Sequence, residues 1–258
     1  MITLLSPSKG QNFDVTEVET HSQPQLLSQS KQLMARLKDM SQSEIKSLMS
    51  ISDRLAELNY ERFQQFKTPF KLGSSKQAVL AFQGDVYAGL KAEELNQNDL
   101  SFAQDHLRIL SGLYGYLKPL DLIMPYRLEM KTKLTVDKDE NLYQFWGDAI
   151  TDCLNDELTE QDTVINLASN EYFKAIKSNK LKARLISINF KDIKDGKTRV
   201  VAIYAKIARG AMARAIIENH VNNPEDIQQL VVDDYRYQAD LSDDKNWTFT
   251  RKQPPPKS

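Results

Sequence analysis

Apolar positions in the first quarter of the chain follow two different spacings. Residues 2–5 form a short, largely apolar run, which predicts a buried strand. From residue 26 to residue 40 the apolar positions recur every three or four residues, and residues 45–58 continue this spacing, so two amphipathic helices are expected. Ser41 and Glu44 have the spacing of a capping box, which places the start of the second helix at Ser41.

The middle of the chain mixes short apolar runs with turn residues. Residues 78–82, 142–146 and 164–167 are apolar runs of strand length, and each predicts a short strand. Residues 148–158 have helical spacing and predict a helix between the last two strands. These elements are short, so the middle of the chain is expected to consist of small pieces joined by turns.

A helix followed by a glycine-bearing turn is expected near residue 110. The capping box Ser101–Gln104 predicts its start, and Gly112 predicts its end, because glycine adopts left-handed backbone angles without strain. Gly112 and Gly115 then precede a short apolar segment at 119–124, which has the outline of a helix–hairpin–helix. In that motif backbone amides contact DNA phosphates, although many helix pairs also turn through glycines. Two basic residues lie nearby, after the turn: Lys118 and Arg127.

The clearest local pattern is a β-hairpin. Residues 184–193 alternate polar and apolar side chains, Asp195-Gly196 is typical of a tight primed turn, and residues 198–204 are rich in β-branched and aromatic types. A helix over 205–219 is expected to follow. Because strands and helices mix without a regular βαβ repeat, the predicted fold class is α+β, that is, mixed α/β and rich in helices. We expect one domain over 1–250 and a disordered tail, RKQPPPKS, over 251–258.

Composition excludes several classes of protein. Cys153 is the only cysteine, which excludes an intrachain disulfide and a four-cysteine metal site and favours a reducing, cytoplasmic location. The three histidines, His21, His106 and His220, share no metal-ligand spacing, so we expect no metal and no cofactor. No leader sequence is apparent, and no apolar stretch approaches the roughly 18 residues of a membrane helix, so we expect no membrane partner. The oligomeric state stays open, with a monomer as one option.

Charge is distributed unevenly along the chain. The formal net charge is only -1. Residues 1–170 carry a net charge of -7, residues 171–220 carry 12 basic and four acidic side chains, a net of +8, and residues 221–258 carry -2. A basic block of this kind is often no more than a solvated surface, but it is also the pattern of a surface that binds a polyanion.

The expected helix over 205–219 carries part of this basic block on one face. Lys206, Arg209 and Arg214 fall within an arc of roughly 140° when the helix is projected, opposite a face of small apolar residues. Cations in a first helical turn are disfavoured by the helix dipole, so a bound phosphate is one explanation for Lys206 and Arg209. Pairing with an internal carboxylate such as Glu171 is the other, and the residues favour neither.

Several polar residues follow expected strands and form a candidate site. Lys9 ends the motif Ser6-Pro-Ser-Lys9 after the first strand, where a loop lysine often contacts phosphate, and a Ser–Lys nucleophile pair is the weaker interpretation. Asp85 and Asp148 each follow a glycine, which suits an acid–base or metal-binding group but also a helix cap. The polar run after the apolar stretch at 164–167 contributes further candidates: Asn166, Ser169, Glu171 and Tyr172.

Six strings along the chain carry a resemblance to a known family. They are LLSPSK (4–9), AFQGDVYAGL (81–90), HLRILSGLYGYLKPLDLIMPYRLEM (106–130), LYQFWGD (142–148), VINLASNEYFK (164–174) and YAKIARGAMARAIIEN (204–219). They closely resemble the YaaA family of bacterial peroxide stress resistance proteins. The chain departs from the family pattern in SPSK, where SPAK is more usual, and over residues 10–25 and the C-terminal region.

The resemblance implies a function that composition and spacing do not. It implies a cytoplasmic protein that limits iron-dependent (Fenton) oxidative damage, with a family-specific single-domain fold. It also implies a positively charged cleft and a helix–hairpin–helix that bind double-stranded or branched DNA. Carried over by position, the hairpin is residues 106–127, and the cleft draws on Lys9, Lys206, Arg209 and Arg214.

Two hypotheses for function follow. The leading one is a DNA-binding stress protein that contacts the backbone through the basic cleft and the hairpin. The alternative is an enzyme that acts on a phosphorylated small molecule or a nucleic acid end, with Asp85, Asp148 and Glu171 as candidate catalytic groups. Convergence of these side chains in one concave pocket favours the enzyme, and an open basic groove favours DNA binding.

Overall fold

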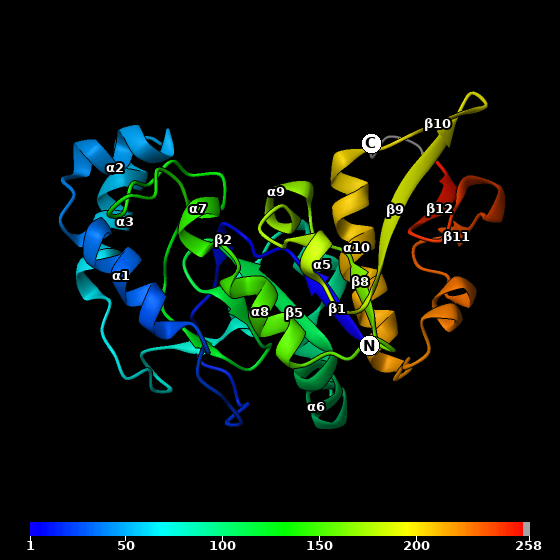
Figure 1. The fold of residues 1–258 in the computed structure, drawn as a ribbon, viewed down its shortest axis with the longest axis horizontal. Coiled ribbons are helices and arrows are strands. Elements are labelled where there is room, and N and C mark those ends of the chain that lie inside the picture. The colour runs from blue at the N-terminus through cyan, green and yellow to red at the C-terminus, as the bar shows by residue number, and fades with distance from the viewer. Residues whose placement is uncertain (255–258) are drawn as a thin grey trace.

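The computed structural model describes residues 1–254 of the 258-residue chain, and residues 255–258 lie outside the described part. Its centre is a mixed sheet with the strand order β11-β12-β9-β8-β1-β5-β6, to which β10 adds by pairing with β9 (Figure 1). The strands are β1 (Ile2–Leu5), β5 (Leu107–Ser111), β6 (Gly115–Leu117), β8 (Thr163–Asn166), β9 (Arg184–Lys194), β10 (Lys197–Arg199), β11 (Arg236–Tyr237) and β12 (Asn246–Lys252). The predicted mixed α/β class is confirmed at this level.

The central strands run parallel and are buried. β1 pairs in parallel with β5 on one side and with β8 on the other, and β9 and β12 continue the parallel arrangement beyond β8. Every residue of β1, β5 and β8 is buried, which is why these strands read as continuous apolar runs and not as alternating ones. The predicted strands at 2–5 and 164–167 are confirmed to within a residue.

The order of the strands creates a switch point between β1 and β8. From β1 the chain reaches β5 and β6 on one side of the sheet, and only afterwards builds β8, β9 and β12 on the other side. The connections therefore leave the carboxyl ends of β1 and β8 in opposite directions. In open α/β sheets a crevice forms at this point, and it is the usual place for a ligand.

Three helices from the first quarter of the chain form the left-hand end of the molecule in Figure 1: α1 (Leu27–Lys38), α2 (Gln42–Met49) and α3 (Asp53–Gln65). The capping box at Ser41 is present, as predicted. The second expected helix is divided in two, because Ser50 takes a left-handed conformation with φ of 51° and Ser52 caps α3.

The predicted strand at 78–82 is wrong. Residues Ala78–Ala81 form a single helical turn, α4, between two short strands. These are β3 (Lys76–Gln77), which pairs with β7 (Leu122–Ile123), and β4 (Phe82–Gln83), which pairs with β2 (Gly10–Gln11). All four residues of α4 are buried, and a short apolar run is equally compatible with a buried strand or a buried helical turn.

The predicted helix–hairpin–helix is a β-hairpin instead. Helix α6 (Gln97–His106) begins at a capping box formed by Asn96 and Asp99, not at Ser101–Gln104, and it ends before Leu107. The residues that follow are the buried strand β5 and its antiparallel partner β6. The apolar run after His106 fills the sheet core, and a helix continuing to Gly112 would expose part of it.

Two helices lie between β7 and β8. The expected strand at 142–146 is wrong, because these residues form the helix α7 (Leu142–Trp146), which Asn141 caps. The expected helix at 148–158 is confirmed as α8 (Ala149–Asp156). The remaining short helices are α9 (Asn170–Phe173), η1 (Ala92–Glu94), η2 (Ser178–Lys180), η3 (Pro224–Gln229) and η4 (Ala239–Leu241).

The hairpin β9–β10 is confirmed, with Asp195 and Gly196 at positive φ of 52° and 74° in its turn. Its second strand ends at Arg199 and not at residue 204, because helix α10 (Ala202–Glu218) begins earlier than expected. The tip of the hairpin projects beyond the rest of the molecule, at the upper right of Figure 1.

Part of the expected C-terminal tail is a strand. Arg251 and Lys252 are the last residues of β12, and Arg251 donates a hydrogen bond from Nε to the buried Asp192 carboxylate at 2.9 Å. This pairing is long-range and could not be inferred from the local proline-rich composition. Residues 255–258 of the expected tail lie outside the described residues.

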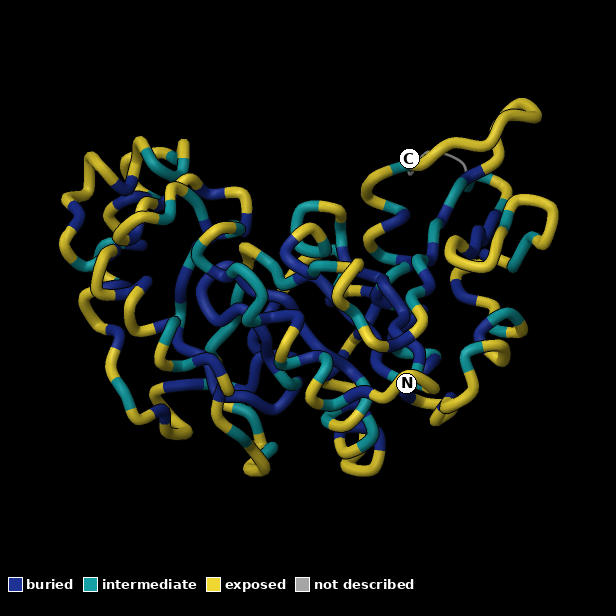
Figure 2. Tube along the Cα trace, in the orientation of Figure 1, coloured by how far each residue is buried: buried dark blue, intermediate teal, exposed yellow. Residues whose placement is uncertain are grey.

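Helices α5 (Asp85–Leu90) and α10 pack backbone against backbone through two glycines. A Cβ atom on Gly89 would lie 2.1 Å from the Ile207 carbonyl oxygen, and one on Gly210 would lie 1.7 Å from the Val86 carbonyl oxygen. Neither position can accept a side chain without separating the helices. The buried residues form one continuous core through the middle of the molecule (Figure 2). None of the helices within residues 1–254 combines the length and the apolar character that crossing a bilayer requires.

Candidate functional site

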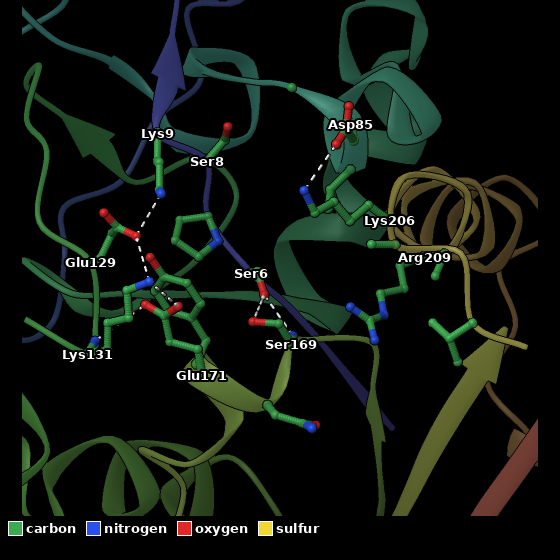
Figure 3. A pocket seen from close by; sticks show the side chains of 18 residues that line it. Ser6, Ser8, Lys9, Asp85, Glu129, Lys131, Ser169, Glu171, Lys206 and Arg209 are labelled. Carbon is green, nitrogen blue, oxygen red and sulfur yellow. Dashed lines mark hydrogen bonds and ion pairs between the residues drawn. The ribbon is translucent and has the colours of Figure 1, made fainter. Parts of the chain in front are cut away.

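A cleft of about 710 Å³ opens at the carboxyl ends of β1 and β8 (Figure 3). It lies at the switch point of the sheet, so the topology alone makes it the expected ligand site. Its lining residues come from the loop after β1, the start of α5, residues 129–131, the loop after β8 with α9, and the first half of α10: Ser6, Pro7, Ser8, Lys9, Gly84, Asp85, Val86, Glu129, Lys131, Ser169, Asn170, Glu171, Tyr172, Val200, Ala202, Ala205, Lys206 and Arg209.

Hydrogen bonds between the two strand ends form the floor of the cleft. The Ser169 backbone N–H donates to Ser6 Oγ at 2.8 Å, and the two hydroxyl oxygens are 3.3 Å apart. The Tyr87 hydroxyl, from α5, donates to the Ser6 carbonyl at 3.1 Å. The loops after β1 and β8 and the helix α5 are thereby held in fixed relative positions.

One wall of the cleft is built around the carboxylate of Glu129. It contacts Lys9 Nζ at 2.7 Å, Lys131 Nζ at 3.5 Å and the Arg127 guanidinium at 3.6 Å. Partial burial alone would raise the pKa of the Glu129 carboxyl, but the hydrogen bond and charge of Lys9, together with Lys131 and Arg127, hold this pKa below its usual value. Lys9 is therefore engaged by Glu129, which leaves the Ser–Lys nucleophile interpretation without support.

Helix α9 adds a second carboxylate to the same wall. Glu171 Oε1 accepts the Lys131 backbone N–H at 3.3 Å, and its Oε2 lies 4.0 Å from Lys131 Nζ. The neighbouring Tyr172 ring also lines the cleft, and burial raises the pKa of its hydroxyl well above the usual value, so it stays protonated. Glu171 pairs with neither cation of α10. Pairing with an internal carboxylate, one of the two explanations for these cations, holds for Lys206, whose partner is Asp85, and not for Arg209.

The opposite wall carries a single ion pair between α5 and α10. Lys206 Nζ lies 3.2 Å from Asp85 Oδ2, and both side chains are substantially exposed at the mouth of the cleft. Because α5 and α10 are in backbone contact at Gly89 and Gly210, this pair has a fixed base. Exposed ion pairs of this kind contribute little stability, and a ligand can replace either partner at low cost.

Arg209 differs from the lysines of the cleft, because no carboxylate within residues 1–254 pairs with it. Within residues 1–254 it makes no ion pair and no hydrogen bond, and its buried Nε is unsatisfied. Burial of the side chain lowers the pKa of its guanidinium, with no carboxylate to compensate. Figure 3 shows its guanidinium directed from α10 toward the side of the floor where Ser169 lies. A largely buried cation without an acceptor is a ready site for an anion.

The structure brings together seven of the sequence-predicted site residues: Lys9, Asp85, Ser169, Glu171, Tyr172, Lys206 and Arg209. Sequence reasoning missed Glu129 and Lys131, which complete one wall. They lie in a segment without regular secondary structure; Glu129 falls within the family string at 106–130, but nothing singled out its carboxylate. In the sequence, polar residues alternate with mainly apolar ones over 126–134, which places Glu129 and Lys131 on the same polar side.

Three other predicted residues lie away from the cleft. Asp148 binds Lys180 at 2.6 Å on an exposed surface. The Asn166 side chain is buried and bridges the Ala168 backbone and Ser187. Arg214, further along α10, binds the carbonyls that end α5 and forms ion pairs with Glu94 and Glu218, so it connects the two helices.

The residues of the predicted DNA-binding hairpin are mostly engaged inside the protein. The Gly112 carbonyl accepts the Trp146 indole N–H at 3.0 Å, and Gly115 lies against the Trp146 ring. Lys118 contacts Glu157 at 3.5 Å. Arg127 alone lies beside the cleft, through its contact with Glu129. The buried glycines leave no glycine-bearing turn on the surface here for a phosphate to approach.

The carboxylates of the site do not gather as metal ligands do. Within residues 1–254 no group of three or more His, Cys, Asp or Glu side chains is close enough together to hold a metal ion. Asp85 and Glu171 lie on opposite walls of the cleft, each bound to a lysine.

Comparison with known proteins identifies the family. The family model described as peroxide stress protein YaaA matches residues 1–241. The chain belongs to the YaaA family. It is also similar to a UPF0246 protein of Colwellia psychrerythraea, with 48% identity over 98% of this chain and 100% of the relative. A UPF0246 protein of Acaryochloris marina is 45% identical over 97% of this chain and 100% of the relative.

The strings that resemble the YaaA family converge on the cleft. Five of the six strings contribute lining residues, although they are spread from residue 4 to residue 219, and only LYQFWGD at 142–148 contributes none. Segments that are far apart in the chain and carry the family resemblance thus meet at the cleft, which supports the cleft as the candidate functional site of this YaaA-family chain.

Proposed function

We propose that this YaaA-family protein acts in peroxide stress by binding phosphate groups of nucleic acid in the cleft between β1 and β8, with double-stranded or branched DNA as the partner. The observation that carries the proposal is Arg209, a largely buried guanidinium without an acceptor at the switch point of the sheet. A planar guanidinium donates two parallel hydrogen bonds to phosphate, and this interaction is stronger where water is excluded. The Ser169 hydroxyl on the floor supplies a further polar contact.

A second basic surface supports contact with a nucleic acid backbone. The projecting hairpin β9–β10 carries exposed cations at Lys194, Lys197 and Arg199. The hairpin and α10 both belong to the segment of net charge +8, between two segments of net negative charge. A polyanion is attracted to the positive end of such a distribution, and its affinity falls steeply with salt because bound counterions are released.

DNA binding connects the proposed function to peroxide stress, because the bound protein shields DNA from oxidation. Iron-dependent oxidation damages DNA where iron is bound to it, so a protein bound at phosphate groups limits such damage without storing iron. One cysteine and three scattered histidines are also a poor set of ligands for an iron store.

A second candidate is favoured by the mixed charge of the cleft. Asp85 and Glu171 face the cavity from opposite walls, and Arg209 lies on the same side as Asp85, with its guanidinium directed toward the side of the floor where Ser169 lies. This arrangement suits an enzyme that acts on a phosphorylated small molecule or a nucleic acid end, with a carboxylate as acid or base. Asp148 is not part of this candidate, because it lies away from the cleft.

A mobility-shift titration tests the proposal. Duplex, four-way junction and single-stranded DNA are compared at two salt concentrations with the natural chain and with Arg209→Ala. We expect at least tenfold weaker binding by Arg209→Ala. Arg54→Ala is the matched control, because Arg54 is exposed on α3 and does not line the cleft, and it should bind normally. Equal binding by Arg209→Ala and the natural chain, or no binding to any of the three DNAs, would overturn the proposal.

A further inference from the structure

The two walls of the cleft constrain which kind of phosphate can reach Arg209. We infer that the cleft selects a terminal phosphomonoester, the group found at the end of a nucleic acid strand or on a nucleotide, over the internal phosphodiesters of a continuous strand. The inference rests on the proposed function, because it takes Arg209 as a phosphate-binding residue. It adds the chemical class of the ligand.

Carboxylates stand on both walls of the cleft. Glu129 and Glu171 form the wall across the cavity from Arg209, and Asp85 stands on the same side as Arg209, beside Lys206. A strand that passed through the cleft would carry its flanking phosphates toward these walls. Like charges in close contact are costly, whereas a terminal phosphate enters with only one neighbouring group.

The charges inside the cleft nearly balance. Lys9, Lys131, Lys206 and Arg209 face Asp85, Glu129 and Glu171, which leaves one positive charge in excess. A continuous basic groove would carry several. This small excess suits one phosphate group and not the run of phosphates along a continuous strand, which carries one charge per nucleotide.

A phosphomonoester has as many terminal oxygens as the hydrogen-bond donors of the cleft can contact. It has three terminal oxygens, against two in a diester. The Arg209 fork can take two of them, and the third can accept from the Ser169 hydroxyl or from Lys206, whose side chain is more than half exposed. Lys206 can leave Asp85 for the phosphate at little cost, because their ion pair is solvent-exposed.

The size of the cleft agrees with this class of ligand. At about 710 Å³ it falls within the ~300–1,000 Å³ range of small-molecule sites. A cleft of this size holds a nucleotide or the last residue of a strand, so double-stranded or branched DNA reaches Arg209 through a strand end. Val200, which is 61% exposed at the edge of the cleft, gives an apolar surface for the part of the ligand beyond the phosphate.

The test compares one oligonucleotide with a 5′-phosphate, with a 3′-phosphate and with hydroxyls at both ends, as a single strand and as a duplex, by fluorescence anisotropy at constant ionic strength. A nucleoside monophosphate serves as competitor. We expect at least tenfold tighter binding with a terminal phosphate than without. This preference should increase between pH 5.5 and 7.5 as the second ionisation of the monoester, near ~6, is completed.

Variants separate this inference from the proposed function. In Arg209→Met the preference for a terminal phosphate should fall to about one, and in Arg54→Ala it should be unchanged. Displacement of the oligonucleotide by the nucleoside monophosphate would identify a nucleotide as a sufficient ligand, and a terminal preference without displacement would identify the strand end. Equal binding of phosphorylated and unphosphorylated strands that still depends on Arg209 would overturn this inference alone. Binding that does not depend on Arg209 would overturn the proposed function as well.

Discussion

Arg209 has the properties of a residue that is retained for binding and not for stability. Its Nε is buried and unsatisfied, and within residues 1–254 no carboxylate compensates its charge. Taking a charged group out of water costs several kcal/mol unless it is paired, so this position lowers the stability of the unliganded protein. Proteins commonly accept such a cost at functional sites.

Replacing Arg209 by methionine should stabilise the unliganded protein. Arg209→Met keeps most of the side-chain length and removes the buried charge, so the free energy of unfolding without phosphate should rise by about 1 kcal/mol. Urea denaturation in a phosphate-free buffer measures it, and Arg54→Met should stay within about 0.5 kcal/mol of the natural chain. A loss of more than about 1 kcal/mol in Arg209→Met would instead make the guanidinium a structural group.

A second prediction concerns the reactivity of the Cys153 thiol, the group by which a protein would sense peroxide. Burial, reinforced by the negative charges of Asp156, Glu157 and Asp152, raises the pKa of the Cys153 thiol to about 11. Only about one molecule in 10⁴ then carries the reactive thiolate at pH 7. Labelling by iodoacetamide at pH 8 should be at least about 100-fold slower in the folded protein than in urea, where the pKa returns to about 8.5.

We therefore expect that Cys153, the single thiol of the chain, does not sense peroxide. Cys153→Ser should preserve peroxide resistance in cells that depend on this protein. Fast labelling of the folded protein, or loss of resistance in Cys153→Ser with an intact fold, would contradict this conclusion.

Among the elements, the backbone contact between helices α5 and α10 sets the geometry of one wall of the cleft. Gly210→Ala would place a Cβ atom 1.7 Å from the Val86 carbonyl oxygen and force the two helices apart. Helix propensity alone predicts a stabilisation of about 1 kcal/mol for glycine to alanine, whereas overpacking predicts a loss of about 1–3 kcal/mol. We expect the loss, together with weaker phosphate binding, because Asp85 and Lys206 lie on the two separated helices. Thermal unfolding gives the sign, and a stabilised variant would contradict the packing argument.

The hairpin β9–β10 is the element expected to contact a nucleic acid backbone. Replacing Lys194, Lys197 and Arg199 together by glutamine should lower the salt dependence of DNA binding, with the slope of log K against log salt falling by about 2–3. Anisotropy titrations at several salt concentrations measure the slope. The control replaces three exposed lysines at the other end of the molecule by glutamine: Lys31, Lys67 and Lys71. An unchanged slope in the hairpin variant, or an equal change in the control, would exclude the hairpin from the interface.

Elements with strong local signals were predictable from the sequence. The turn at Asp195-Gly196 and the capping box at Ser41 depend on a few neighbouring residues, and both are present. The runs at 78–82, 107–111 and 142–146 were misassigned because a short apolar run is buried in any conformation, and the rest of the fold decides which one forms.

The candidate site was predictable only in part, for a related reason. Lys9, Asp85 and Glu171 follow strands or precede helices, so their positions could be proposed from the pattern of elements. The partners of these residues could not. Whether Glu171 pairs with Arg209 or with Lys131 depends on contacts between distant segments, and this choice decides whether Arg209 is free to bind a ligand.

At the scale of the whole molecule, the sheet explains why distant segments meet at one point. β1 is the first strand of the chain and lies inside the sheet, with β5 on one side of it and β8 on the other. The loops after β1 and β8 therefore meet at their carboxyl ends, where α5 and α10 are packed over them. The cleft is a consequence of strand order, and the family strings gather there for that reason.

The most direct measurement of the central claim is the NMR signal of the Arg209 side chain. The Nε–Hε resonance is assigned as the one absent from Arg209→Lys, and inorganic phosphate is titrated into the natural chain at constant ionic strength. We expect this resonance to shift and saturate as phosphate binds the Arg209 guanidinium, while the resonance of Arg54 does not move. An Arg209 resonance that stays in place throughout the titration would contradict the account.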